Sequence, residues 1–217
     1  MTNGEKTEVA TASRFLWVGE HPCVDFLNTL INKDGRRLDM IEDFAALLSW
    51  CAEAGLLRSE QVKESGSRWN GTAEEAAALE SARYLRQVLR DMAQQVIADG
   101  EIGQSALDTV NGWLRQGVGF QEVVRAHSDG ASLRGKFALH FKGKVEKPED
   151  IVVLLCACAA DLMCHADLGT LKKCSNPACV LLFLDASKNH TRRWCSMNLC
   201  GNRSKASAHY ERHRKRS

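Results

Sequence analysis

The segment KKCSNPACVLLFLDASKNHTRRWCSMNLCGNR, residues 172–203, contains two cysteine pairs with the same spacing. Four residues separate Cys174 from Cys179 and Cys195 from Cys200, and fifteen residues lie between the two pairs. Four thiolates in two short-spaced pairs suit tetrahedral Zn²⁺, and because all four positions are sulfur we expect one closed, structural zinc site per chain. A redox pair or inert structural thiols are less favoured alternatives, since redox pairs usually have two residues between the cysteines.

The residues around these cysteines predict the architecture of a small module over residues 170–217. Asn176-Pro177 favours a turn within the first pair, and VLLFLD (180–185) indicates a strand. A turn at 187–190 then returns the chain to the second pair, and a terminal helix is expected over about 198–214. Knuckle, hairpin and helix in this order predict a treble-clef-like four-cysteine zinc finger.

Residues 14–169 are predicted to form a mainly helical domain with one small β-hairpin. Apolar residues recur at helical spacing in four segments, and two shorter helices fit between them; the ranges are 21–31, 39–55, 59–69, 72–100, 103–116 and 148–166. The alternating LRGKFALHF (133–141) predicts a strand that pairs with 120–127 across a turn at Asp129-Gly130. The apolar run at 151–160 is too short to span a bilayer and indicates a buried helix, so we expect no membrane partner.

Charge is distributed unevenly along a chain whose formal net charge is +2. Residues 172–217 hold eleven Lys or Arg and two acidic residues, which gives +9, and residues 1–171 sum to −7. An acidic body with a basic end is typical of nucleic-acid binding, although a solvated basic tail is the alternative. We therefore expect double-stranded DNA as the partner. The predicted contacts are Arg192, Arg193, Arg203, Lys205, His209 and Arg212.

Two residues of this basic segment have two open interpretations each. Asn202 and Arg203 either contact DNA or stabilise the finger, with Arg203 paired to Asp185 and Asn202 bonded to the knuckle backbone. For Trp194 we expect packing against the small core beside the zinc.

A polar stripe interrupts the first predicted helix, where Asp25, Asn28 and Thr29 share one face. Buried polar groups need partners, so these residues either line a pocket for a small-molecule effector or form a buried network. In the network interpretation Asp25 pairs with Arg83 or Arg86. The sequence contains no recognisable nucleophile elbow, phosphate loop or carboxylate pair, and we expect the chain not to be an enzyme.

The cysteine content and the start of the chain both favour the cytoplasm. Nine cysteines would stay reduced there, and the first thirteen residues lack the apolar core of a signal peptide. Outside the two spaced pairs, the other five cysteines lie in apolar helical contexts and are expected to be small buried side chains.

The segment RRWCSMNLCGNRSKASAHYERHR (192–214) resembles the C-terminal zinc finger of the CGNR family, which is named for the four residues found here at 200–203. The preceding KKCSNPACVLLFLDASKN is similar to the first half of that finger, and CVDFLNTL (23–30) resembles the opening motif of the ABATE domain. The resemblance implies a bacterial stress-induced transcriptional regulator with an N-terminal sensory or regulatory domain.

These observations together predict a DNA-binding transcriptional regulator. Many bacterial regulators read paired half-sites, so a homodimer is expected. The alternative function is a zinc-stabilised adaptor that binds RNA or protein.

Overall fold

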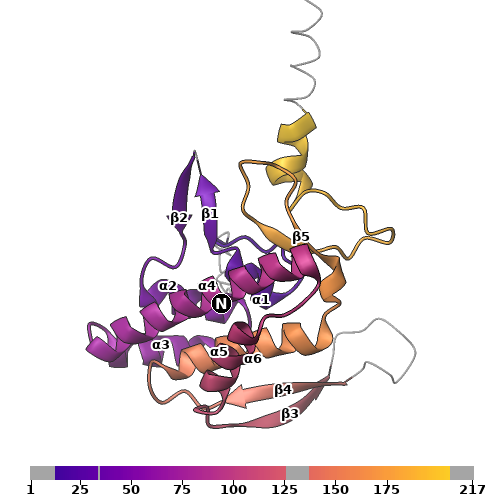
Figure 1. Cartoon of the computed structure of the whole chain (residues 1–217). Helices are drawn as coiled ribbons and strands as arrows, with labels where there is room; N and C mark the ends of the chain where they lie inside the picture. Colours follow the sequence, from indigo (N-terminus) through magenta and orange to yellow (C-terminus); the bar gives the residue numbers. More distant parts are fainter. Residues whose placement is uncertain (1–12, 34, 126–136, 206–217) are drawn as a thin grey trace, which may run out of the picture.

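The computed structural model describes residues 13–33, 35–125 and 137–205, with the side chains of 120–142 left outside the description. Helices dominate this part of the chain, and three two-stranded sheets accompany them (Figure 1). The elements are α1 (Pro22–Leu27), β1 (Leu30–Lys33), β2 (Arg36–Asp39), α2 (Phe44–Glu53), α3 (Ser59–Trp69), α4 (Ala73–Asp99), α5 (Gln104–Leu114), β3 (Gly119–Arg125), β4 (Phe137–Gly143), α6 (Asp150–His165), β5 (Leu171–Lys173) and β6 (Leu182–Leu184). A 3-10 turn (Leu168–Thr170) precedes β5, and a π-helical turn (Met197–Gly201) contains the last cysteine of the finger.

Capping residues decide where the helices begin and end. The Thr72 side chain accepts a hydrogen bond from the third backbone N–H of α4, and Gly100 ends that helix with a φ of 76°. Both boundaries agree with the prediction for 72–100. The Asp43 carboxylate caps α2 by accepting the N–H of Ala46 at 2.7 Å. This cap makes α2 begin later than the 39–55 prediction.

The first predicted helix is also shorter than expected, because the chain leaves α1 and forms the β1–β2 hairpin. The two strands are antiparallel, with Lys33 opposite Arg36. Gly35, in the turn between them, has a φ of 76°, the conformation that favours Asp-Gly in a two-residue hairpin turn. The Asp34-Gly35 dipeptide is a typical hairpin turn, so the sequence contained a signal for this hairpin, although the hairpin was not predicted.

The second hairpin, β3–β4, confirms the strands predicted in the middle of the chain. Its antiparallel register runs from Gly119 opposite Gly143 to Arg125 opposite Phe137. Residues 126–136, which include the predicted turn at Asp129-Gly130, lie outside the described residues.

The main core lies between α4 and α6, with α5 packed against both helices. As predicted from its apolar sequence, α6 is buried over most of its length, including Ile151 and Leu155. Leu171 of β5 and Leu182 of β6 belong to the same cluster. The finger is therefore anchored in the body through its own hairpin.

The finger has a smaller core of its own, which consists of Cys174, Cys179, Leu181, Phe183, Cys195 and Cys200. Partly buried side chains pack against it from three segments, and they include Val18, Ile31 and Trp194. The mainly α fold, the hairpin and the four-cysteine finger confirm the predicted fold class. Within the described residues, every helix is too short or too polar to cross a membrane.

Candidate metal centre and nucleic-acid interface

The four predicted cysteine ligands come together at one point. The sulfur atoms of Cys174, Cys179, Cys195 and Cys200 all lie within 4.8 Å of one another, and all four residues are buried. The Sγ atoms of Cys179 and Cys195 are 4.0 Å apart. Tetrahedral Zn–S bonds of about 2.3 Å require sulfur separations of about 3.8 Å, so the geometry fits one zinc ion.

The protonation chemistry of these thiols also favours a cation at their centre. The hydrogen bond between Cys195 and Cys179 lowers the pKa of Cys179 to about 5 and raises the pKa of Cys195 well above its usual range. Burial raises the pKa of Cys200 as well. Without a metal, the cluster therefore favours the deprotonated form of some of its cysteines and the protonated form of others. A divalent cation at the centre stabilises all four as thiolates. The site is a structural zinc site.

An amide group orients the ligands from outside the sulfur cluster. Asn176 donates from Nδ2 to the Sγ of Cys200 at 3.4 Å, and its Oδ1 accepts the N–H of Ala178 at 3.1 Å. The first contact links the first knuckle to the second cysteine pair, and the second closes the Asn176-Pro177 turn. Donors to sulfur stabilise the thiolate form, so Asn176 supports the zinc site without being a ligand.

Asp185 is fully buried and ties the finger together. Its Oδ2 accepts the ammonium of Lys172 at 2.6 Å and the backbone N–H of Arg192 at 2.9 Å. Ser187 donates to the other oxygen from both its N–H and its hydroxyl. Burial alone would raise the pKa of Asp185, but these hydrogen bonds hold it well below its usual range. The carboxylate therefore stays charged and joins β5 to the loop before the second cysteine pair.

The residues after Cys200 divide between the finger's interior and its surface. Gly201 is buried, and a Cβ at this position would lie 2.6 Å from the Sδ of Met197, so a larger residue would have to displace the Met197 side chain. Asn202 and Arg203 are exposed. The predicted Arg203–Asp185 pair is wrong, because Lys172 occupies the carboxylate instead.

Arg192 joins the finger to the N-terminal segment. Its guanidinium donates to the Glu20 carboxylate at 2.7 Å and to the carbonyl oxygen of Val18 at 2.9 Å. It also donates to the Trp194 carbonyl oxygen, and its central carbon lies 4.3 Å from the centre of the Phe183 ring. Because these contacts occupy the guanidinium, we assign Arg192 a structural role in place of the predicted phosphate contact.

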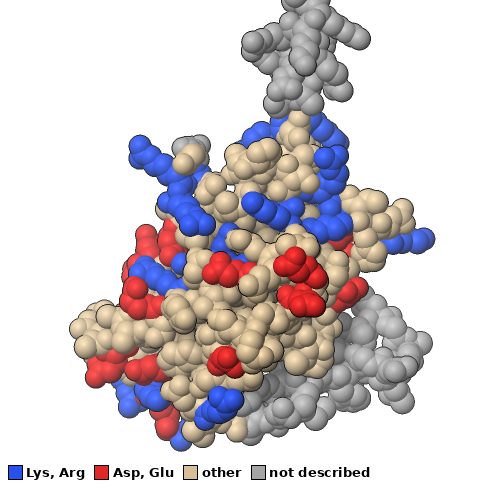
Figure 2. All heavy atoms as spheres, viewed as in Figure 1, with Lys and Arg blue, Asp and Glu red and all other residues tan. Residues whose placement is uncertain are grey.

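The outer surface of the finger is basic. Within the described residues 170–205 the exposed cations are Lys173, Lys188, Arg193, Arg203 and Lys205, and Asp185, the one acidic residue, is buried. Lys and Arg side chains surround the finger in the upper part of Figure 2. The Arg193 guanidinium lies 5.4 Å from the ring centre of Trp194, which packs against the zinc-site core as predicted. The other two predicted contacts, His209 and Arg212, lie outside the described residues.

Asp25 is buried in the body and binds backbone N–H groups. Its Oδ1 accepts the N–H of Val18 at 2.9 Å and of Gly19 at 2.7 Å. The predicted ion pair of Asp25 with Arg83 or Arg86 is therefore wrong. Burial raises the pKa of Asp25 to about 6, and the two N–H donors only partly offset that effect.

Asn28 connects α1 directly to the finger. Its Nδ2 donates to the carbonyl oxygen of Leu182 and its Oδ1 accepts the N–H of the same residue, both at 2.8 Å. This paired contact imitates the hydrogen bonds of a neighbouring strand at the edge of β6. The Leu184 N–H donates to the Gly19 carbonyl oxygen at 3.0 Å, which bonds β6 to the segment that precedes α1 as well.

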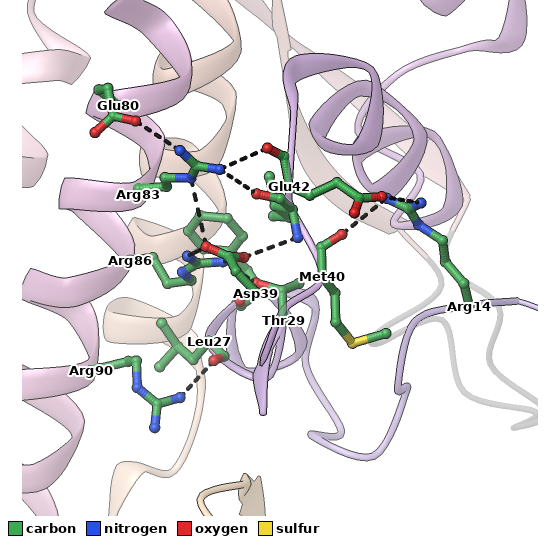
Figure 3. A network of polar contacts seen from close by, with 12 residues as sticks. Arg14, Leu27, Thr29, Asp39, Met40, Glu42, Glu80, Arg83, Arg86 and Arg90 are labelled. Carbon is green, nitrogen blue, oxygen red and sulfur yellow. Dashed lines mark hydrogen bonds and ion pairs between the residues drawn. The ribbon is translucent and has the colours of Figure 1, made fainter. Parts of the chain in front are cut away.

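Thr29 and the root of the β1–β2 hairpin are held by arginines of α4 (Figure 3). Arg86 donates to the Thr29 hydroxyl at 2.7 Å and forms a two-pronged pair with Asp39, the last residue of β2. Arg90, one turn further along, donates to the last carbonyl oxygen of α1 at 2.7 Å and to that of Val180 at 3.2 Å. Asp25, Asn28 and Thr29 thus all have buried polar partners, and of the three side chains Asn28 is the one that bonds to the finger.

A cavity of about 900 Å³ lies elsewhere in the body, between the start of α1, the α2–α3 loop, α3, the base of β3–β4 and α6. Leu57 and Trp69 are among its apolar lining residues, and Arg58 and Arg68 are among its polar ones. Sequence reasoning missed this cavity, because its walls come from five separate segments and share no spacing along the chain.

Comparison with known families agrees with this division of the chain. The model of the ABATE family, described as "Putative stress-induced transcription regulator", matches residues 20–166, and that of the CGNR zinc finger matches residues 170–213. A comparison with curated proteins finds no match. The ABATE match covers well over half of the chain and contains α1 to α6, while the second match contains all four clustered cysteines. The chain therefore belongs to the ABATE family and carries a CGNR zinc finger.

Proposed function

We propose that this protein is a transcriptional regulator whose zinc finger binds the phosphates of double-stranded DNA. The observation that carries the proposal is the positive charge of the finger surface. In the described residues 170–205 the one acidic residue, Asp185, is buried, and the exposed ionised side chains are cationic. The zinc site and the contacts of Arg192 and Asn28 hold this surface rigidly on the body. A preorganised cationic surface favours a polyanion because binding releases the counterions of DNA.

Arg193, Arg203 and Lys205 are the described residues that we assign to DNA. They are exposed, and none of them takes part in the ion pairs of the described finger. Phosphate contacts position a protein without selecting a sequence, whereas arginine can also bind guanine through two hydrogen bonds. The assignment of His209 and Arg212 to DNA stays a prediction.

The test measures binding of the zinc-loaded, full-length chain to a labelled duplex by fluorescence anisotropy over a series of salt concentrations. Replacing Arg193 and Arg203 together with alanine should weaken binding and reduce the slope of log K against log salt by roughly two, at about 0.9 for each lost phosphate contact. The matched control replaces Lys63 and Arg115, exposed cations on α3 and after α5, and should leave the slope unchanged.

Failure of the unaltered chain to bind duplex DNA at low salt, with its zinc in place, would overturn this proposal. Competition with single-stranded RNA separates the regulator from an RNA-binding adaptor, because a DNA regulator should keep its preference for the duplex. In the absence of any nucleic-acid binding, the protein-binding adaptor becomes the better function.

The cavity supports a sensing role for the N-terminal domain, with a small amphipathic molecule as the effector. His21 lines the cavity, and its neighbour Glu20 pairs with Arg192 of the finger. Glu20 has a φ of 64°, a left-handed conformation that is uncommon for a residue with a side chain. A ligand that shifts His21 would therefore act on a strained residue that touches the finger.

An amphipathic dye, anilinonaphthalene sulfonate, tests whether the cavity takes such molecules. Dye fluorescence should rise with the unaltered chain and rise less with Ala157→Phe, because Ala157 lines the cavity and a phenyl ring would fill it. Equal fluorescence for both proteins, with equal thermal stability, would contradict the sensing role.

Three expectations belong to the same proposal. We expect the chain to act by binding and not by catalysis. Burial raises the pKa of Cys158, a thiol that lines the cavity, to about 12, so this thiol is a poor nucleophile. It works in the cytoplasm, where its thiols stay reduced. A homodimer that reads paired half-sites stays a prediction.

A further inference from the structure

We propose that the β1–β2 hairpin of the N-terminal domain is a second DNA-binding arm, in which Lys33, Arg36 and Arg37 contact phosphates beside those bound by the finger. This inference rests on the proposed binding of DNA by the finger. It adds a contact from the body, the part of the chain whose summed charge is negative.

The hairpin concentrates positive charge at exposed positions. Lys33, Arg36 and Arg37 are all exposed, and Asp39 is bound to Arg86 at the root of the hairpin. The other acidic residue of this segment, Asp34, lies outside the described residues, and residues 30–39 hold three basic and two acidic residues. The strand register places Lys33 directly opposite Arg36. Like charges opposite each other destabilise an antiparallel pair, so this arrangement favours a polyanionic partner that relieves the repulsion.

The position of the hairpin suits a shared DNA surface. It projects from the body on the same side as the finger, with β1 as the nearer strand (Figure 1). Ile31 of β1 packs against the finger's core, and the Asn32 Nδ2 donates to the Ala178 carbonyl oxygen at 3.4 Å. Basic side chains stand on both the hairpin and the finger on the face seen in Figure 2. A duplex that contacts the finger would therefore extend past the hairpin.

The root of the hairpin is fixed firmly enough to act as an arm. The Met40 N–H donates to the Thr29 carbonyl oxygen at 2.8 Å and closes the end of the ladder. Arg86 bonds both Thr29 and Asp39, one residue at each end of the hairpin (Figure 3). Side chains on such a rigid base lose less conformational entropy on binding than those of a loose tail, and a two-stranded ribbon is narrow enough to follow a DNA groove.

The experiment compares the zinc-loaded, full-length chain with a variant that carries Lys33→Ala, Arg36→Ala and Arg37→Ala. We expect weaker binding to a labelled duplex and a salt slope lower by roughly two to three, because about 0.9 is lost per phosphate contact. The loss should be equal for duplexes of unrelated sequence, since phosphates carry no sequence information. A second variant with Arg36→Lys and Arg37→Lys keeps the charge and should retain most of the slope.

The matched control removes three exposed cations from other parts of the body, by Lys63→Ala, Arg115→Ala and Lys147→Ala, and has the same net charge as the hairpin variant. Zinc content and thermal unfolding show that each variant is folded. An equal salt slope for hairpin variant and control would overturn the arm while leaving DNA binding by the finger intact. If the unaltered chain binds no DNA, the proposed function fails and the arm fails with it.

Discussion

The body buries a continuous cluster of apolar side chains from its helices, whereas four of the six buried residues in the finger's own core are cysteines. Burial of apolar surface can stabilise the body, because α4, α5 and α6 cover one another. A module as small as the finger has too little apolar surface to fold by that effect alone. The finger therefore depends on two supports, the zinc ion inside it and the body beneath it.

These two supports meet in β5 and β6. Leu171 and Leu182 belong to the body's core, while Cys174 and Cys179 lie in the turn that joins the same two strands. Loss of the zinc should therefore unfold the finger and also remove part of the cover from the body. A finger cut from the chain would expose both leucines, which is why the DNA-binding experiments use the whole protein.

Breaking the zinc site should give the largest effect. Cys195→Ser should reduce the zinc content from one ion per chain to none, because three sulfurs do not close the tetrahedral site. The helices of the body should remain in far-ultraviolet circular dichroism, with a lower melting temperature than in the unaltered chain. Cys164→Ser, at an exposed position on α6, is the control and should keep both the zinc and the melting temperature. Retention of one tightly bound zinc by Cys195→Ser would contradict the assignment.

The zinc ligands were predictable because their evidence is local. Two pairs with equal spacing and a short connection restrict where the cysteines can lie, and the structure brings all four together. The helices of the body were predictable for a similar reason, since caps such as Thr72 and Gly100 are encoded within a few residues of the ends that they set.

Partners across the fold were much harder to predict. The shared helical face of Asp25, Asn28 and Thr29 indicated burial, but it held no information on which segment would pack there. Asn28 binds the backbone of Leu182, and a backbone partner leaves no signal in the sequence. Similarly, the position of Arg192 beside Arg193 suggested one role for both, although Arg193 is exposed and Arg192 bonds to the N-terminal segment.

The charge of the body also shows that a property summed along the sequence does not reveal how residues are arranged in space. The sum of −7 over residues 1–171 averages along the sequence, but a ligand meets charges that are grouped in space. The exposed cations of β1 and β2 stand on the side of the body that carries the finger (Figures 1 and 2). A hairpin in a negatively charged domain can therefore extend the basic surface of its neighbour.

Separating the finger from the body should have the next largest effect. Asn28→Ala leaves both the N–H and the carbonyl oxygen of Leu182 without partners in a buried position, and each orphaned group costs about 1–3 kcal/mol. We expect the free energy of unfolding in urea to fall by about 3 kcal/mol while one zinc per chain is retained. Asn32→Ala is the matched control, because Asn32 is exposed and makes one long contact to the finger. A loss no greater than that of the control would show that the two units are held together by other contacts.

Asp25 offers the smallest and most specific test, since it holds the Val18–Gly19 turn that bonds to the finger. Its pKa is about 6 in the folded chain, above the ordinary value of 3.8. A carboxyl with a raised folded-state pKa contributes stability at low pH, and that contribution is lost as the pH rises through 6. In Asp25→Asn the side chain cannot titrate, while its remaining oxygen can still accept the two backbone N–H groups.

The stability of Asp25→Asn relative to the unaltered chain should therefore increase by about 1 kcal/mol between about pH 5 and about pH 8, as measured by urea unfolding at each pH. Acid release of zinc affects both proteins alike and cancels in this difference. Asn32→Ala is the control, because it removes no titratable group, and its difference from the unaltered chain should not change with pH. A flat difference for Asp25→Asn as well would mean that the carboxylate is better solvated in its turn than its burial indicates, and that the turn holding Arg192 is more open to water than the body's core.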